Sequence, residues 1–273
     1  MAPARPLHAD LSDLESAMDA AWPASERHEA DGWVLRAAGG VTQRANSIWP
    51  RQDSDEGAAG FPAMLRGARS WYRSRRLPVI FQVLEDGRMA SLTTFLDGLG
   101  FTRQSETLVM TRGPWPGAPE EAGTADNGRT VELSGEPSDE WLHLWWDIDG
   151  RGGDDALATA RDILTGCLAV YALVRDDDGR PAAVGRLALP NGPGRRGGIY
   201  CMATHKDSRR QGYGTAVLRA LLSEGAARDL DGYWLLVTAA NDAAQALYSA
   251  AGFQETARYH YRQDPPRRAL AGC

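Results

Sequence analysis

One pattern of elements occurs twice along the chain, and it limits the fold to a layered α/β architecture. In the second half, residues 216–226 place apolar side chains on one stripe of a helix, and residues 233–238 (YWLLVT) have the composition of a buried strand. A second amphipathic helix is predicted over 242–250. Gly252 and Phe253 then give a helix stop, and a final strand follows. Helices alternating with strands in this way cover a sheet.

The first half repeats this order. Residues 63–73 and 91–99 have helical periodicity, with a strand pattern (VIFQV) at 79–83 between them. Gly100 and Phe101 stand where the later Gly-Phe pair stands, before another strand. We interpret the repeat as an internal duplication. The alternative is that two unrelated α/β domains share a common order.

A segment rich in Pro, Gly and acidic residues, 113–128, separates the two halves. It has no apolar periodicity, so we interpret it as a linker. The chain of 273 residues is long enough for two cores. We therefore predict an N-terminal domain over 1–112 and a C-terminal domain over 129–273.

The composition of the chain excludes several classes of binding partner. Asp and Glu number 36 against 30 Lys and Arg, which gives a net charge of −6 and argues against a general nucleic-acid binder. Cys167, Cys201 and Cys273 lie far apart, so we expect neither a disulfide framework nor a metal centre. The sequence has no secretory signal and no apolar run of membrane length. A cytoplasmic protein without a membrane partner is expected, as a monomer or a homodimer.

A glycine-containing loop carries the strongest chemical signal. It joins a strand over 199–204, which follows a predicted hairpin, to the helix at 216–226, and it reads RRQGYGT over 209–215. Unpaired N–H groups and the helix dipole make such a junction an anion site, and Gly212 and Gly214 let a phosphate approach the backbone. The spacing is not that of GxGxxG, and no Gly-Lys-Ser/Thr follows. This argues against dinucleotide-binding and P-loop folds.

Arg-Arg-Gln-Gly-Tyr-Gly resembles the Gln/Arg-x-x-Gly-x-Gly/Ala signature of the GCN5-related N-acetyltransferase (GNAT) family. The order of elements over roughly residues 130–262 and the Ala251-Gly252-Phe253 stop resemble the family as well. The resemblance implies an α/β fold of two GNAT-like domains, each with a mixed, mainly antiparallel central sheet flanked by helices. It also implies acetyl-CoA as co-substrate, with its pyrophosphate on the loop and its pantetheine arm along the strand, which splays from its neighbour to admit the arm. The cofactor-binding residues that it implies are Met202, Thr204, Arg209, Arg210, Gln211, Gly212, Tyr213, Gly214, Thr215 and Asn241.

Catalysis in the family is direct attack of an amine on the thioester. Tyr248 matches the tyrosine that protonates the departing thiolate, and the alternative is a core aromatic. Asn241 could contact the pantetheine, or it could simply cap the last helix.

The general base and the acceptor site stay open in the sequence. Some family members carry a Glu near the start of the strand before the loop, where this chain has Gly197 and Gly198. The sequence offers four other candidates for the base: His143, Asp147, Asp149 and His205. The acceptor amine could bind through ring faces and carboxylates, for which we name Trp145, Trp146, Asp147 and Asp149. The alternative is that the Trp side chains pack in the core.

In the first half, the position of the loop holds RQDSDEGAAG over 51–60, whose acids would repel a pyrophosphate. We expect a degenerate GNAT-like domain that does not bind acetyl-CoA. Its Arg44, Asn46 and Ser47 could help to shape the acceptor pocket.

The leading hypothesis is an acetyl-CoA-dependent N-acetyltransferase acting on the primary amine of a small molecule. Alternatives are acetylation of a protein N-terminus or lysine, and a non-catalytic module that senses acyl-CoA.

Overall fold

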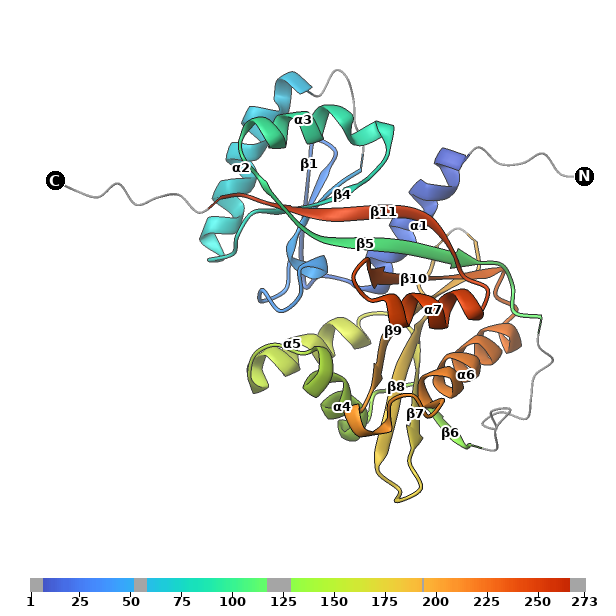
Figure 1. Ribbon diagram of the computed structural model, residues 1–273. Helices are drawn as coiled ribbons and strands as arrows, with labels where there is room; N and C mark the ends of the chain where they lie inside the picture. Colours follow the sequence, from blue (N-terminus) through green and yellow to red (C-terminus); the bar gives the residue numbers. More distant parts are fainter. Residues whose placement is uncertain (1–6, 52–57, 117–128, 193, 266–273) are drawn as a thin grey trace, which may run out of the picture. The chain divides into compact units, whose positions relative to one another are not determined.

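The computed structural model describes residues 7–51, 58–116, 129–192 and 194–265 (Figure 1). The chain forms two compact units. Unit 1 comprises Met1–Pro23, Val109–Val237 and Asn241–Thr256, and unit 2 comprises Ala24–Leu108, Thr238–Ala240 and Ala257–Cys273. These units differ from the predicted domains at both chain ends, because the first segment groups with the second half and the last with the first half. Residues 117–128 of the predicted linker lie outside the described residues.

Unit 1 is a mainly antiparallel sheet with helices. Strands β6, β7, β8 and β9 pair antiparallel in that order, and β10 adds in parallel to β9. The strands are β6 (Val131–Ser134), β7 (Ala169–Arg175), β8 (Pro181–Ala188), β9 (Arg196–Thr204) and β10 (Gly232–Thr238). The helices are α1 (Leu7–Ala21), α4 (Asp139–Asp149), α5 (Asp154–Thr165), α6 (Tyr213–Ala227) and α7 (Asp242–Ala250), with a short helix η4 (Lys206–Ser208) before α6.

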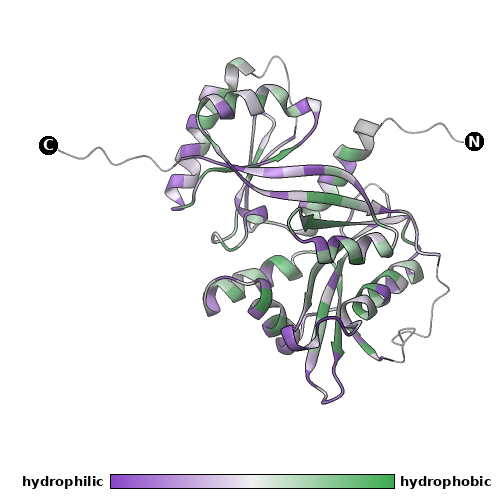
Figure 2. Ribbon diagram, in the orientation of Figure 1, coloured by the Kyte–Doolittle hydropathy of each residue, from purple (hydrophilic) through white to green (hydrophobic). Residues whose placement is uncertain are grey.

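Alternating side chains divide this sheet into two covered faces. Gly185 faces α6 so closely that a Cβ there would lie 2.7 Å from Val217. On the opposite face, Tyr171 packs edge-to-face against Trp141 of α4, and its hydroxyl donates to the Leu164 carbonyl of α5. Figure 2 shows β7 to β9 as largely hydrophobic and the β7–β8 turn as hydrophilic. Unit 1 therefore has its core on both sides of the sheet.

Unit 2 has the same kind of layering. Its strands are β1 (Glu26–Ala30), β2 (Trp33–Ala37), β3 (Ile48–Pro50) and β4 (Ile80–Leu84), and its helices are α2 (Phe61–Ser74) and α3 (Ala90–Gly98). Three short helices complete it: η1 (Arg44–Asn46), η2 (Ala58–Gly60) and η3 (Gly87–Met89). Strands β5 (Thr102–Arg112) and β11 (Gln254–Gln263) contribute residues to both units. The core between the helices and the sheet includes Trp33, Phe61, Leu65, Phe81 and Leu96.

The predicted repeat is present, including its helix stops. The order α2, β4, α3, β5 matches the order α6, β10, α7, β11. Gly100 and Gly252 both have left-handed backbones, with φ of +74° and +83°. After α3, Phe101 N–H donates to the Leu96 carbonyl, and after α7, Phe253 N–H donates to the Tyr248 carbonyl. These are matching Schellman motifs, in which glycine avoids the cost of a Cβ.

Two residues expected to shape an acceptor pocket instead hold unit 2 together. The Asn46 amide accepts from the Ala38 and Gly40 N–H groups and donates to the Thr42 carbonyl, so it fixes the loop after β2. The Ser47 hydroxyl accepts from Arg36. Both side chains are buried, and the pocket role proposed for them was wrong. The acidic residues of the loop at 52–57 lie outside the described residues.

Two glycines of unit 2 provide a test of the helix stop. No atom lies within 4 Å of a Cβ built on Gly100 or on Gly67, so neither substitution meets a clash. Gly100→Ala forces a side chain into the left-handed region and should lower the free energy of unfolding by about 1 kcal/mol. Gly67→Ala, in the exposed middle of α2, should raise it by about 0.5 to 1 kcal/mol. Urea denaturation followed by tryptophan fluorescence measures both, and effects of the same sign would contradict the assignment of the motif.

Candidate functional site

Strand β9 separates from β10 partway along its length. The parallel pairing runs from Arg196 opposite Gly232 to Ile199 opposite Leu235. Beyond this point β9 continues to Thr204 and β10 to Thr238. The two strands therefore share a paired first half and diverge in their second halves, as the family resemblance implies.

A bulge lies in β9 where the divergence begins. Cys201 and Met202 together oppose the single residue Gly185 of β8, and Cys201 has φ of +54°. The Met202 sulfur lies 2.6 Å from where a Cβ on Gly185 would be, so the glycine makes room for it. A bulge bends its strand and increases the local twist, and it is common beside active sites.

Aromatic rings occupy the place where some family members carry a glutamate. A Cβ on Gly198 would lie 2.5 Å from the Tyr200 ring and 2.6 Å from the Trp234 ring. The Trp234 indole donates to the Tyr200 hydroxyl at 3.0 Å. A carboxylate side chain could not enter this space without displacing both rings.

The glycine loop ends in the N-terminus of α6. Arg210 and Gly212 have left-handed backbones, with φ of +65° and +85°. The helix begins at Tyr213, earlier than predicted, so the N–H groups of Tyr213, Gly214 and Thr215 belong to its first turn. First-turn N–H groups have no partner within the helix and carry the positive end of the dipole. The backbone geometry of the junction is thus suited to an anion.

The side chains of the loop fall into two groups. Arg209 and Gln211 are exposed and bond back to the backbone, at the Thr204 carbonyl and the Asp207 carbonyl. Tyr213 is largely buried beneath the Arg129 guanidinium, and its side chain lines the acidic cavity described below. Gly214 is close to both β9 and α7, since a Cβ there would lie 3.3 Å from the Thr204 hydroxyl and 3.9 Å from Leu247.

Tyr248 is held by the Schellman motif at the end of α7. Its ring packs against Phe253 with centroids 6.2 Å apart, and only 7% of the residue is exposed. Burial raises the pKa of the Tyr248 phenol well above its usual range, and the nearby Asp149 and Cys201 raise it further. The phenol therefore keeps its proton at neutral pH.

Asp149 is the last residue of α4 and lies close enough to Tyr248 to act on its charge. Desolvation of the carboxylate raises the pKa of Asp149, although the residue as a whole is exposed. A hydrogen-bonding contact with Trp145, one turn earlier in α4, and the charge of Arg151 lower this pKa in part. The pKa of Asp149 is thus higher than that of an ordinary aspartate, and its carboxylate lies near the protonated phenol of Tyr248.

The four residues proposed for the acceptor do not form one site. Trp145 is buried, as the core interpretation predicted, and shares a face with Asp149. Trp146 packs over the turn after α4, where its indole donates to the Gly152 carbonyl. Asp147 lines a different cavity. Residues two apart on a helix point to opposite sides, which separates Asp147 from Asp149.

Asn241 caps α7. Its side-chain oxygen accepts from the Ala244 N–H at 3.1 Å, which confirms the capping interpretation.

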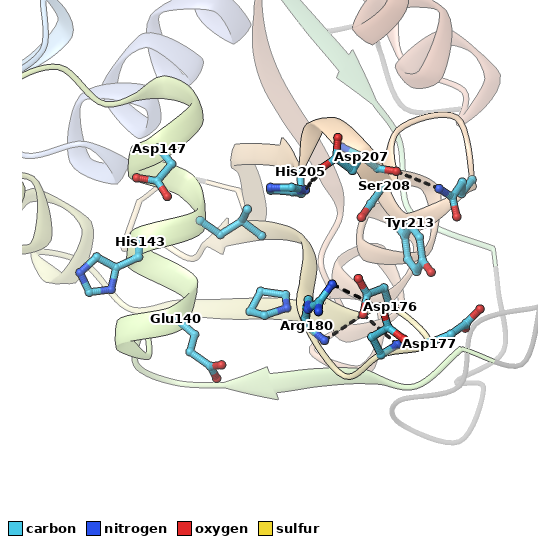
Figure 3. A pocket seen from close by; sticks show the side chains of 14 residues that line it. Glu140, His143, Asp147, Asp176, Asp177, Arg180, His205, Asp207, Ser208 and Tyr213 are labelled. Atoms are coloured by element: carbon cyan, nitrogen blue, oxygen red, sulfur yellow. Dashed lines mark hydrogen bonds and ion pairs between the residues drawn. The ribbon is translucent and has the colours of Figure 1, made fainter.

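Asp147 faces an acidic cavity of about 800 Å³ between α4, the β7–β8 turn and the loop after β9 (Figure 3). His143 and His205, two of the candidate bases, also line it. Its one arginine, Arg180, pairs with Asp178 at 3.4 Å. Tyr248 and Asp149 are not among the lining residues. The carboxylates that line it are those of Glu140, Asp147, Asp176, Asp177, Asp178 and Asp207.

No helix within the described ranges has the length and hydropathy to cross a bilayer. No group of three or more His, Cys, Asp or Glu side chains in the same ranges could hold a metal ion.

A diverging parallel strand pair, a bulge and a glycine loop at a helix N-terminus define an acetyltransferase of the GNAT type. The chain belongs to the family described as "Probable histone acetyltransferase Rv0428c C-terminal", which it matches over residues 8–262.

Relatives and solved structures agree with this assignment. The chain is 27% identical over 267 residues to the uncharacterized N-acetyltransferase YobR of Bacillus subtilis (strain 168), covering 93% of this chain and 98% of that protein. Among structures, a GCN5-related N-acetyltransferase from Kribbella flavida superposes with a TM-score of 0.65 at 17% identity, over 97% of both chains. A tandem GNAT protein from the clavulanic acid biosynthesis pathway gives 0.66 at 14%, over 95% and 94%. At these identities the structures show the shared fold.

The contact between Trp145 and Asp149 can be tested directly. Trp145→Phe removes the indole N–H that lowers the pKa of Asp149, so this pKa should rise further. Carboxyl-carbon NMR across a pH titration measures it, with Asp149→Asn to assign the signal. Trp146→Phe is the matched control, because that indole donates to Gly152 instead. An unchanged Asp149 titration in Trp145→Phe would rule the contact out.

Proposed function

We propose that unit 1 transfers the acetyl group of acetyl-CoA to the primary amine of a small molecule, by direct attack in a ternary complex. The divergence of β9 from β10 carries this proposal. It leaves the second half of β9, which leads to the loop before α6, without its partner in β10. A transferase has to bring an extended donor and a nucleophile together at such a point.

The residues of the loop fit coenzyme A. First-turn N–H groups of α6 suit a pyrophosphate, and Gly214 keeps side-chain atoms away from Thr204 and Leu247. Arg209 and Arg210 add exposed positive charge beside it. Backbone groups of Met202 and Thr204 in the diverging part of β9 would hold the pantetheine arm. When bound, acetyl-CoA supplies an acetyl thioester activated for attack by an amine.

Tyr248 would act as the general acid. Its buried phenol stays protonated, because desolvation and the charge of Asp149 both disfavour the phenolate. A protonated phenol can donate to a sulfur that leaves as thiolate.

Asp149 would act as the general base. Of the four carboxylate and histidine candidates, it alone acts on Tyr248, whereas His143, Asp147 and His205 line the acidic cavity. Its raised pKa makes it a stronger base than an ordinary aspartate, which suits removal of a proton from an ammonium or an attacking amine. Its negative charge also attracts a cationic acceptor.

A second candidate function is acetylation of a protein lysine. The acidic cavity favours it, because its carboxylates suit a basic segment of a protein. The name of the family, which describes a probable histone acetyltransferase, points the same way. We rank the small-molecule acceptor first because Tyr248 and Trp145 are buried. A small amine can enter a buried site completely, whereas a protein can insert only one side chain. Rates with a panel of alkylamines, aminosugars and a lysine-rich peptide decide between the two.

Acetyl-CoA should bind once per chain, and Gly212→Glu should weaken binding at least about tenfold. The substitution puts a carboxylate beside the anion site and strains a backbone with φ of +85°. Isothermal titration measures the stoichiometry and the dissociation constant. Gly179→Glu is the matched control, because its φ is +78° and it lies in the β7–β8 turn. A wild-type protein that takes up no acetyl-CoA at millimolar concentration would end the proposal.

Asp149→Asn should lower kcat about 100-fold and remove the acid limb of the pH–rate profile. The carboxylate is the active form, so activity is full above the Asp149 pKa and is lost as pH falls through it. Because that pKa is raised, the loss should start above the pH at which an ordinary aspartate protonates. Initial rates against pH measure this, with Asp147→Asn as the neighbouring control that should keep the acid limb.

Tyr248→Phe should lower kcat with unchanged affinity for acetyl-CoA, and full turnover would refute the role of Tyr248 as general acid.

A further inference from the structure

The end of the N-terminal helix is embedded in unit 1. The described residues of α1 and those up to Pro23 belong to unit 1, although the next stretch of chain forms unit 2. Ala21 is fully buried and Trp22 is 4% exposed. Pro23 passes so close to the end of α5 that a Cβ on Gly166 would lie 2.6 Å from it. This segment is therefore part of the core on the α4–α5 face of the sheet.

A buried arginine fixes the end of α1. Arg186 of β8 is fully buried, and its guanidinium donates to the Ala21 carbonyl at 3.0 Å. A cation at a helix C-terminus complements the helix dipole and satisfies one of its last carbonyls. The same guanidinium lies 5.8 Å from the centroid of the Tyr200 ring. Arg186 thus joins α1 to the strand that carries the bulge.

Trp22 touches both residues that border the reaction centre. Its ring stacks on Tyr200, with centroids 5.5 Å apart and planes at 26°, and it meets the edge of Trp145 at 6.4 Å. Tyr200 directly precedes the bulge at Cys201, and Trp145 lies one turn before Asp149 on the same face of α4. Among the ring contacts of the described residues, Trp22 is the single aromatic side chain that packs against both Tyr200 and Trp145.

We propose that Trp22 is a positioning residue of the acetyl-transfer centre, which holds Trp145 and Tyr200 in place and through Trp145 fixes Asp149 against Tyr248. Trp22 itself transfers no proton. This inference rests on the proposed function in one respect, the assignment of Asp149 as general base. Packed aromatic rings hold neighbouring groups to a narrow range of positions, and small displacements of a catalytic group are costly in rate.

Two other charged or titratable groups are coupled to Asp149. Arg151, two residues later, lowers its pKa, and Tyr248 of α7 lies close enough for the charge of Asp149 to act on it. Only the Trp145 contact is in the path from Trp22. A substitution of Trp22 should therefore change the titration of Asp149 without removing these other influences.

The test compares Trp22→Leu, which keeps apolar bulk but no ring, with Trp22→Phe, which keeps a ring that can stack. In Trp22→Leu the Asp149 pKa should rise, kcat should fall about tenfold, and the dissociation constant of acetyl-CoA should stay the same. Trp22→Phe should restore most of the rate. Trp33→Leu, in the core of unit 2, is the control for general loss of stability.

Carboxyl-carbon NMR of the free protein gives the Asp149 titration, and it needs no acceptor. Rates use the amine of the panel that the wild-type enzyme acetylates fastest. A double-mutant cycle with Asp149→Asn then tests the path, because residues that act through one another are not additive. If Trp22 acts through Asp149, Trp22→Leu should have little further effect on kcat in the Asp149→Asn background.

The outcomes separate the two proposals. If Asp149→Asn alone leaves kcat and the acid limb intact, the proposed base is wrong. If Asp149→Asn is defective but Trp22→Leu leaves the Asp149 titration unchanged, or lowers kcat equally in both backgrounds, the positioning role is overturned. If Trp33→Leu reproduces the altered titration, the effect is one of stability and the positioning role fails as well.

Discussion

The structure of the site depends on the two different pairings of β9. On one side the strand pairs antiparallel with β8, and on the other it pairs in parallel with β10. The two kinds of ladder space their hydrogen bonds differently. The antiparallel ladder has a bulge at Cys201 and Met202, and the parallel ladder ends just before it. Two rings lie at this point, because Tyr200 and Trp234 fill the space that Gly198 leaves.

The local parts of this arrangement could be predicted from the sequence. The anion loop, the Gly-Phe stops and the N-cap at Asn241 each depend on residues within a few positions of one another. Their chemistry is set by glycine's backbone freedom, by unpaired N–H groups and by one short polar side chain. The family resemblance then supplied the divergence of β9 from β10, which periodicity alone does not contain.

The parts that the sequence does not contain depend on contacts between distant segments. Nothing in the sequence near Trp22 indicates that its ring packs on Tyr200 and Trp145. The predicted boundaries at 112 and 129 follow composition, whereas the compact units exchange both ends of the chain. The helical periodicity of α4 does predict that Asp147 and Asp149 lie on different faces, since residues 145 and 149 share a face and residue 147 does not. The sequence gives this phase once the helix is accepted, but it does not say which face meets Tyr248.

Arg186 shows why the first helix cannot be separated from this unit. A fully buried cation is costly unless its donors are satisfied. Here Nη1 donates to the Ala21 carbonyl and Nη2 to the Cys167 sulfur at 3.1 Å, while Nε has no partner among the described residues. The rings of Tyr171 and Tyr200 provide further favourable contact. A chain that began at residue 129 would keep the buried charge and lose its carbonyl partner together with the ring of Trp22. Because the buried Arg186 needs the Ala21 carbonyl as a partner, helix α1 is part of the same unit as the transferase sheet.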